Sequence, residues 1–160
     1  MTDSRTGLGY DCHPVQAGRR LVLGGVEIEH EAGLAGHSDA DVLTHAVIDA
    51  VLGAAGLGDI GEHFPDTEER WRDADSLEML EAVAMLLPSR GLRVVNVDAT
   101  VVIEQPKLAP YREDMRTRLA GALGAAPAAV NVKATTGEGM GFVGRGEGVT
   151  ALAVATLTPA

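Results

Sequence analysis

An aspartate and a histidine stand two positions apart near the start of the chain, in the segment GYDCHPV. Alternate side chains of a β-strand point to the same face, so Asp11 and His13 face one way and Cys12 the other. Carboxylate and imidazole groups are common metal ligands, and two on one face need only a third from elsewhere to form a site. The same residues also fit an ordinary polar strand end before Pro14, so other residues must decide between the two readings.

A third ligand follows in the segment GHSDADVLTH, where His37, Asp41 and His45 recur at every fourth position. On a helix this spacing places them along one stripe. His45 lies in a largely apolar stretch, so we expect a half-buried side chain that needs a polar partner. With Asp11 and His13 it predicts a three-ligand site for zinc or manganese with one position open, as in catalytic sites. The alternative is a solvated polar helix face with acids near its N-terminus.

Two further segments could hold a phosphate group. In VKATTGEG, Lys133 and Thr135 share one strand face, Thr136 lies on the other, and Glu138 stands in the turn that follows. A cation, hydroxyl groups and a carboxylate at a strand end could cradle a phosphate and a magnesium ion. In EQPKLAPY, prolines bound a rigid loop that presents Lys107. Taken alone, the first segment fits an ordinary strand with a polar exit better than a phosphate site.

Two apparent catalytic motifs fail on their context. His37, Ser38 and Asp39 are adjacent, so they cannot align as base, nucleophile and orienting acid. Ser38 is better used as a helix cap or as a phosphate contact at a helix N-terminus. GMGFVG (139–144) matches the glycine spacing of a dinucleotide site, but the residues after it predict a turn into a strand instead of the required helix.

The chain has 160 residues and a formal net charge of −10, with 46% hydrophobic but only 3% aromatic residues. We therefore expect a single domain over 1–160 with a core of Ala, Val, Leu and Ile. The charge argues against nucleic-acid and anionic-membrane partners, and binding a phosphate would require local cations or metal ions. No apolar run resembles a spanning helix or a signal peptide, and the single Cys12 is expected as a small buried residue of a cytoplasmic protein.

Helices and strands alternate along the second half of the chain, which predicts an α/β (α+β) sandwich, a mixed β-sheet with helices packed on one face. Ser38 and Asp41 form a start signal for the first helix, and Gly56 marks its stop. The β-rich segment 21–30 is expected to pair with the opening strand, and 57–75 to be a functional or mobile loop. Further elements are predicted as helices over 38–56, 76–91 and 109–124, strands over 92–105, 129–136 and 149–157, and a glycine loop over 137–148.

Taken together, these segments closely resemble the 2-C-methyl-D-erythritol 2,4-cyclodiphosphate synthases of the non-mevalonate isoprenoid pathway. The resemblance runs from about residue 9 to residue 155, with GYDCH, GHSDADVLTHAVIDAVLGAAGLGDIGEHFPDT, QPKLAPY and NVKATTGEGMGFVGRGEG in family order. It implies a homotrimer with active sites between subunits. It also implies a substrate that carries a cytidine diphosphate and a distal 2-phosphate.

The resemblance assigns roles to particular residues. Zinc (or manganese) would be held by Asp11, His13 and His45, and magnesium (or manganese) on the substrate diphosphate by Glu138. His37 and Thr136 would position the transition state. Arg145 and Glu147 match a pair that lines the trimer axis, where binding of an isoprenoid diphosphate stays open. The implied substrate-binding residues are His37 and Ser38 at the phosphate end, Asp59, Gly61 and Asp66 at the methylerythritol unit, Ile103, Glu104, Gln105, Pro106, Lys107, Leu108, Lys133, Ala134, Thr135 and Thr136 at the cytidine diphosphate, and Phe142 and Arg145. Gly137 departs from the pattern, since a third threonine is common at that position.

The implied chemistry agrees with the residues. The 2-phosphate oxygen attacks the β-phosphorus, CMP leaves, and a cyclic diphosphate forms. Because a phosphate monoester is largely dianionic at pH 7, this reaction needs no general base. The residues alone also fit a zinc hydrolase that acts on phosphoesters, or a metal-stabilised trimeric binding protein for nucleotides or isoprenoid phosphates.

Overall fold

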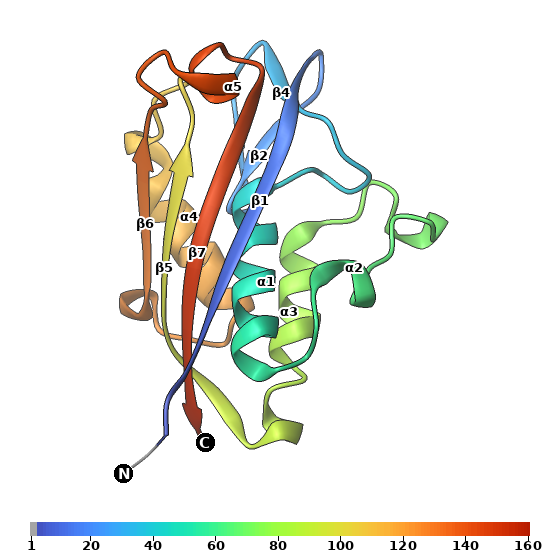
Figure 1. Ribbon diagram of the computed structural model, residues 1–160, viewed down its shortest axis with the longest axis vertical. Coiled ribbons are helices and arrows are strands. Elements are labelled where there is room, and N and C mark those ends of the chain that lie inside the picture. The colour runs from blue at the N-terminus through green and yellow to red at the C-terminus, as the bar shows by residue number, and fades with distance from the viewer. Residues whose placement is uncertain (1–2) are drawn as a thin grey trace.

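A five-stranded mixed sheet organises the fold, and its strand order is β4-β1-β7-β5-β6 (Figure 1). The computed structural model describes residues 3–160. β5 and β6 run parallel, and the other neighbours pair antiparallel. The strands are β1 (Arg5–Ala17), β4 (Ala32–Leu34), β5 (Leu92–Val102), β6 (Val130–Thr135) and β7 (Gly148–Pro159).

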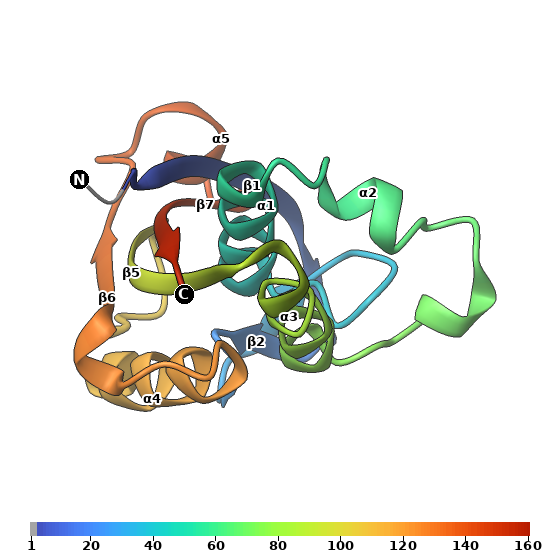
Figure 2. The same cartoon turned by 90° about the horizontal axis from the view of Figure 1, so that it is seen from below.

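The three main helices lie on one side of this sheet, as Figure 2 shows, which confirms the predicted architecture. They are α1 (Val42–Ala55), α3 (Ser76–Ala84) and α4 (Arg112–Ala122). α1 is buried on nearly every side, because β1 and β7 cover it from one direction and α3 from another. No helix among residues 3–160 is long and apolar enough to cross a membrane.

Two glycines of β1 let α1 approach the sheet very closely. Gly7 and Gly9 point toward the helix, and a Cβ atom on Gly9 would lie only 1.8 Å from the backbone oxygen of Ala46. A Cβ atom on Gly7 would lie 2.1 Å from the backbone oxygen of Ala50. Because side chains alternate along a strand, Asp11 continues the face of these glycines and also points toward α1. The glycines therefore set the spacing at which strand and helix residues meet.

The opposite face of the sheet is uncovered and partly apolar. Leu8 is 68% exposed and Tyr10 52% exposed. Each is paired across the strands with an exposed residue of β7, Leu8 with Val154 and Tyr10 with Leu152. Cys12 lies on the same face and is exposed. The prediction that Cys12 is buried is therefore wrong, because only the other face of β1 packs against helices.

The segment 21–30 does not pair with the opening strand, contrary to prediction. It folds on itself as the hairpin of β2 (Leu21–Leu23) and β3 (Val26–Ile28). The partner of the far end of β1 is instead β4, with Val15 opposite Leu34. The hairpin can separate from the sheet because its apolar side chains join the core around α1.

The first helix begins at residue 42 instead of residue 38. Asp41 is its N-cap and accepts hydrogen bonds from the backbone and hydroxyl groups of Thr44. The same carboxylate accepts the N–H groups of Gly24 and Gly25, and so anchors the hairpin turn to the helix. Ser38 therefore does not cap the helix, and His37 lies outside it. The predicted stop is confirmed, since Gly56 adopts a left-handed conformation at the C-terminus.

Two other helices are shorter than predicted. Pro88 and Gly91 bound a separate 3-10 turn, η2 (Pro88–Arg90), after α3 has ended. The expected helix over 109–124 begins with another such turn, η3 (Ala109–Tyr111), before α4. A third turn, η4 (Pro127–Ala129), precedes β6. The glycine loop contains the four-residue α5 (Gly141–Gly144) and then enters β7, so GMGFVG does not open the long helix of a dinucleotide site.

The loop over 57–75 is partly ordered by short helices and an aromatic pair. It contains α2 (Ile60–His63) and the turn η1 (Glu69–Trp71). The Phe64 and Trp71 rings pack edge to face with centroids 4.9 Å apart. The Asp49 carboxylate of α1 accepts the N–H of Ile60 at 2.7 Å and fixes one end of the loop.

Candidate metal centre and substrate site

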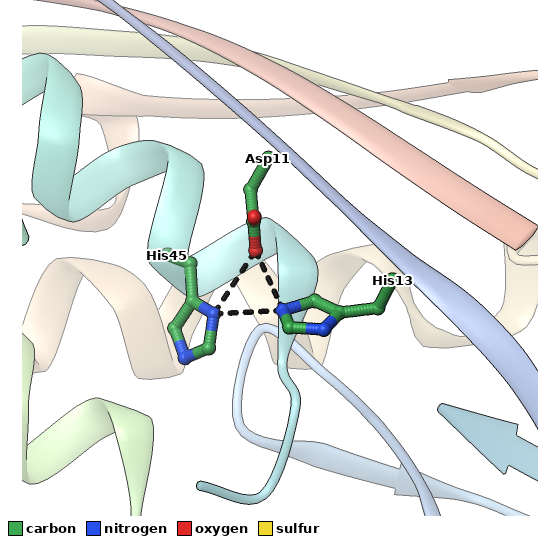
Figure 3. Close-up of side chains that lie close together, drawn as sticks. All are labelled: Asp11, His13 and His45. Carbon is green, nitrogen blue, oxygen red and sulfur yellow. Dashed lines mark hydrogen bonds and ion pairs between the residues drawn. The ribbon is translucent and has the colours of Figure 1, made fainter. Parts of the chain in front are cut away.

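The three predicted metal ligands converge where β1 meets α1 (Figure 3). Asp11 Oδ2 lies 2.8 Å from His13 Nε2 and 3.0 Å from His45 Nδ1, and the two nitrogens are 3.2 Å apart. A tetrahedral site with metal–nitrogen bonds of about 2.0–2.1 Å places neighbouring ligand atoms roughly 3.3 Å apart. The triangle is slightly tighter than this value, so a small outward movement of the ligands would admit a metal ion.

The outer contacts of the two imidazoles favour a cation at this point. His13 Nδ1 lies 2.8 Å from the carbonyl oxygen of Ala35, which can only accept, so Nδ1 carries a hydrogen and the neutral ring has its lone pair on Nε2. On His45, Nε2 contacts the hydroxyl oxygens of Ser38 at 3.1 Å and Ser76 at 2.9 Å, while Nδ1 faces Asp11. Hydrogen bonds of this kind to the far nitrogen of an imidazole are typical of metal-binding histidines. The chemistry of the donor set therefore fits zinc or manganese.

Without a metal, protons supply the positive charge in this cluster. Burial raises the pKa of Asp11, but its hydrogen bonds and ion pairs with His13 and His45 outweigh burial and lower the pKa to about 2. Burial lowers the pKa of His13, whereas its contacts with Asp11 and Ala35 raise it, and the resulting pKa lies above the ordinary histidine value. Both shifts favour a negative aspartate beside a positive partner.

A second group of predicted residues meets at the end of β5 and β6. A cavity of about 200 Å³ is lined by the loop that follows β5 and by the last residues of β6. The backbone N–H of Ile103 donates to the carbonyl oxygen of Thr135 at 2.9 Å and joins the two segments. The predicted residues that line the cavity are Ile103, Pro106, Lys107, Leu108, Ala134, Thr135 and Thr136.

Glu104 connects this loop to the glycine loop. Its carboxylate accepts the backbone N–H of Gly137 at 2.5 Å. A Cβ atom on Gly137 would lie 3.1 Å from that carboxylate and 2.9 Å from the backbone nitrogen of Gly144. A larger residue at position 137 would therefore fit only if the loop moved. The next residue, Glu138, is exposed, and its carboxylate accepts the hydroxyl of Thr136 at 3.2 Å. The departure at Gly137 thus corresponds to a close approach of two loops beside the predicted magnesium ligand.

Lys133 does not line the cavity. Its ammonium group pairs with the carboxylate of Asp98 on β5 at 2.6 Å, and Asn131 donates to the same carboxylate. These contacts lower the pKa of Asp98 below the ordinary aspartate value, chiefly through the hydrogen bond from Lys133. At the C-terminal end of α5, Arg145 binds the carboxylate of Glu147 through two nitrogens, at 2.8 and 3.0 Å.

The residues predicted at the methylerythritol unit lie in or beside the loop over 57–75. The carboxylate of Asp59 accepts the N–H of Glu62 as the N-cap of α2, and Gly61 lies within that helix. Asp66 is exposed in the following turn. His37 Nε2 contacts the carbonyl oxygen of Glu68 at 3.2 Å, so the residue before Ser38 is attached to this loop.

Sequence reasoning missed the residues that surround the predicted ones. Ser76 and Asp98 each contact a predicted site residue, but they lie 31 and 35 positions away from it in the chain. Ser76 is the first residue of α3 and is fully buried, which is an unusual place for a hydroxyl group. A polar residue at the start of a predicted helix gave the only signal, and that signal normally indicates capping.

The fold and the site define a class of small α/β proteins with a candidate metal site between the sheet and its central helix. A family model described as the YgbB family matches residues 4–158. The bifunctional enzyme IspD/IspF of Anaeromyxobacter dehalogenans is 63% identical over 155 residues, which are 97% of this chain and 40% of that protein. The 2-C-methyl-D-erythritol 2,4-cyclodiphosphate synthase of Alkaliphilus oremlandii is 54% identical over 98% of this chain and 99% of its own length.

Solved structures agree with these relatives. A CDP complex of IspF from Plasmodium falciparum superposes with a TM-score of 0.86 at 29% identity, covering 99% of this chain and 98% of that one. The chain spans about two fifths of the length of the bifunctional relatives it matches, and nearly the full length of the monofunctional ones. The chain belongs to the YgbB family, which confirms the resemblance stated from its motifs.

Proposed function

We propose that this chain converts 4-diphosphocytidyl-2-C-methyl-D-erythritol 2-phosphate into 2-C-methyl-D-erythritol 2,4-cyclodiphosphate and CMP. The observation that carries the proposal is the convergence of Asp11, His13 and His45 in a member of this family. The synthase of Alkaliphilus oremlandii is 54% identical to this chain over nearly the full length of both proteins. The reaction is a step of isoprenoid precursor biosynthesis, and the single cysteine suits a reducing cytoplasm.

In this proposal two metal ions would assist the reaction by neutralising phosphate charge. Asp11, His13 and His45 would hold zinc or manganese, and Glu138 would hold magnesium or manganese. Such ions neutralise the charge of the phosphates in a protein whose own net charge is −10. An acidic chain that binds a strongly anionic substrate needs local cations, and these residue types would supply them by holding metal ions.

The remaining site residues bind and align the substrate. The cavity at the end of β5 and β6 is smaller than the ~300–1,000 Å³ of most ligand sites, so it would take the cytosine end and leave the rest of the substrate outside. The 2-phosphate would lie against His37 and Ser38, and the methylerythritol hydroxyls against Asp59 and its loop. Lys133 would exchange its exposed contact with Asp98 for the substrate diphosphate.

The chemical step forms a bond from the 2-phosphate oxygen to the β-phosphorus and breaks the bond from that phosphorus to CMP. The attacking oxygen is already ionised near pH 7, so no side chain has to remove a proton. Catalysis consists of holding the two phosphates in line and stabilising the charge that develops. We assign this positioning to His37 and Thr136, as the family resemblance implies.

The two halves of the proposed site lie on different strands of one subunit. β7 and β5 lie between β1 and β6, so with strands about 4.8 Å apart the metal triad and the nucleotide cavity belong to strands roughly 14 Å apart. The uncovered face of the sheet, with Leu8 and Tyr10 exposed, is the kind of apolar surface that self-association buries. We therefore propose a homotrimer in which each active site takes its metal triad from one subunit and its nucleotide cavity from a neighbour. Arg145 and Glu147 would line the axis.

Incubation of the chain with the cytidine substrate, zinc and magnesium, followed by mass spectrometry, tests this function. Cyclic diphosphate together with CMP is the expected result. Linear hydrolysis products would instead identify a zinc phosphoesterase, and a bound but unchanged substrate would identify a binding protein. Either of these results overturns the proposal.

A further inference from the structure

We propose that Asp39 and Ser76 are positioning residues that hold His45 in the orientation and tautomer needed for metal binding. The three side chains form a hydrogen-bonded series that ends at the metal triad. The inference rests on the metal proposed above, and it extends that site by two residues that contact no ligand themselves.

The direction of each hydrogen bond follows from the chemistry of the groups. The hydroxyl of Ser76 donates to Oδ1 of Asp39 in a short hydrogen bond, because a carboxylate can only accept. A hydroxyl has one hydrogen, so the Ser76 oxygen is left as an acceptor toward its other neighbour. That neighbour is His45 Nε2, at 2.9 Å, which must therefore carry the hydrogen.

The consequence appears on the other side of the imidazole ring. With the hydrogen on Nε2, the neutral ring that binds a metal has its lone pair on Nδ1, the atom that faces Asp11 and His13 in Figure 3. A hydrogen bond from Nε2 toward a carboxylate-backed hydroxyl also makes Nδ1 a better electron donor to a metal. The Asp39–Ser76 pair thus fixes both the direction and the strength of the third ligand.

The surrounding backbone holds this pair firmly in place. Asp39 Oδ2 accepts the backbone N–H of Ser76 at 3.0 Å, and Oδ1 also accepts the N–H of Asp41 at 3.1 Å. The N–H of Asp39 donates to the carbonyl oxygen of Ala74. These bonds attach the start of α3 to the segment just before α1. Ser76 has no exposed surface, so water cannot take over its role at His45.

Replacement of the hydroxyl is the direct test. Ser76→Ala should weaken zinc binding about tenfold, measured by competition with a chromophoric chelator. Loss of such an outer hydrogen bond costs roughly 10–100-fold, and we expect the lower end because Ser38 still offers an acceptor to Nε2 at 3.1 Å. Ser89→Ala, which removes an exposed hydroxyl from η2, is the matched control and should leave zinc affinity unchanged.

Asp39→Asn tests the direction of the series. With its nitrogen at the Oδ1 position, the new amide opposes the N–H of Asp41 and can donate to Ser76, which would then donate to His45 Nε2 and push the imidazole hydrogen onto Nδ1, where it blocks the metal. With its nitrogen at the Oδ2 position, it opposes the backbone N–H of Ser76 and loosens the hold on that residue. This variant should bind zinc at least as weakly as Ser76→Ala. In the Ser76→Ala background the same change should have a smaller effect, because the path through the hydroxyl is already lost and only the backbone contacts of Asp39 remain.

The outcomes separate this inference from the proposal on which it rests. If the unchanged chain does not bind zinc, the metal proposal fails and the inference with it. If the unchanged chain binds zinc and Ser76→Ala binds it within twofold as tightly, the inference alone is wrong. Nitrogen-15 NMR of zinc-loaded unchanged protein adds a test that needs no variant. A slowly exchanging hydrogen on His45 Nε2 supports the series, and rapid exchange with water overturns it.

Discussion

Replacement of Gly9 by alanine should separate β1 from α1 and disrupt the metal triad from a distance. The new Cβ atom would lie 1.8 Å from the backbone oxygen of Ala46, whereas real contacts of this kind are essentially never below 3.0 Å. The helix backbone must therefore retreat by about 1.2 Å. His45 adjoins Ala46, so the 3.0 Å separation between its Nδ1 and Asp11 Oδ2 would grow toward about 4 Å.

This movement should lower both the free energy of unfolding and the affinity for zinc. Overpacking of a core costs about 1–3 kcal/mol, and we expect about 3 kcal/mol here because the obstacle is backbone and cannot change rotamer. A site whose ligands stand about 1 Å too far apart loses much of its function, so zinc affinity should fall at least about tenfold. The free energy of unfolding by urea and a chelator competition measure the two effects.

Gly53→Ala is the matched control, because it adds the same methyl group to the helix that Gly9 faces. Its Cβ atom would find only the Gly7 Cα atom, at 3.8 Å, which is an ordinary contact. Alanine is the better helix former, so this variant should gain about 0.5–1 kcal/mol and keep its zinc affinity. A Gly9→Ala protein with unchanged stability and zinc affinity would refute the view that the glycine face sets the spacing of the triad.

Four further predictions concern the proposed sites. His45→Ala should lose zinc and activity together but remain folded, as metal analysis and circular dichroism can check; full zinc content would contradict the ligand assignment. In the metal-free chain, the lowered pKa of Asp11 gives stability that is present above about pH 4 and lost toward pH 2. The raised pKa of His13 gives stability that is present below pH 6.5 and lost as pH rises through its folded pKa. Since zinc competes with these protons, the rise in melting temperature on adding zinc should grow from pH 5 to pH 8, and a constant rise would argue against the site. Glu138→Gln should shift magnesium activation to higher concentration, and an unchanged titration would reassign Glu138 to a structural turn. A trimer reassembled from equal amounts of a His45 variant and a Thr136 variant should regain about a quarter of the sites, whereas sites built within one chain would regain none.

The sequence predicted local chemistry well because several signals depend only on neighbouring residues. Alternation along a strand placed Asp11 and His13 on one face, and the apolar surroundings of His45 indicated a buried imidazole that needs partners. Those two inferences together were enough to predict the triad. The layered architecture also followed from the alternation of elements in the second half of the chain.

Other features depended on contacts between distant segments. Asp41 was expected to share a stripe with His37, but four donors from the hairpin turn and the helix start make it the N-cap instead. The hairpin over 21–30 was assigned to the wrong partner because β-rich residues indicate a strand and not its neighbour. Cys12 was misplaced because no local pattern says which face of β1 the helices cover.

The packing of Trp71 against Phe64 has a practical consequence for following ligand binding. Trp71 is the only tryptophan in the sequence, and it lies in the loop over 57–75. The Arg70 guanidinium group sits 4.6 Å from its ring centroid, so both the edge and the face of the indole have defined neighbours. Its fluorescence therefore reports on this one loop without any label. Binding of a methylerythritol phosphate beside Asp59 and Asp66 should change that emission on the time scale of loop movement, which would make the chain its own optical sensor in stopped-flow experiments.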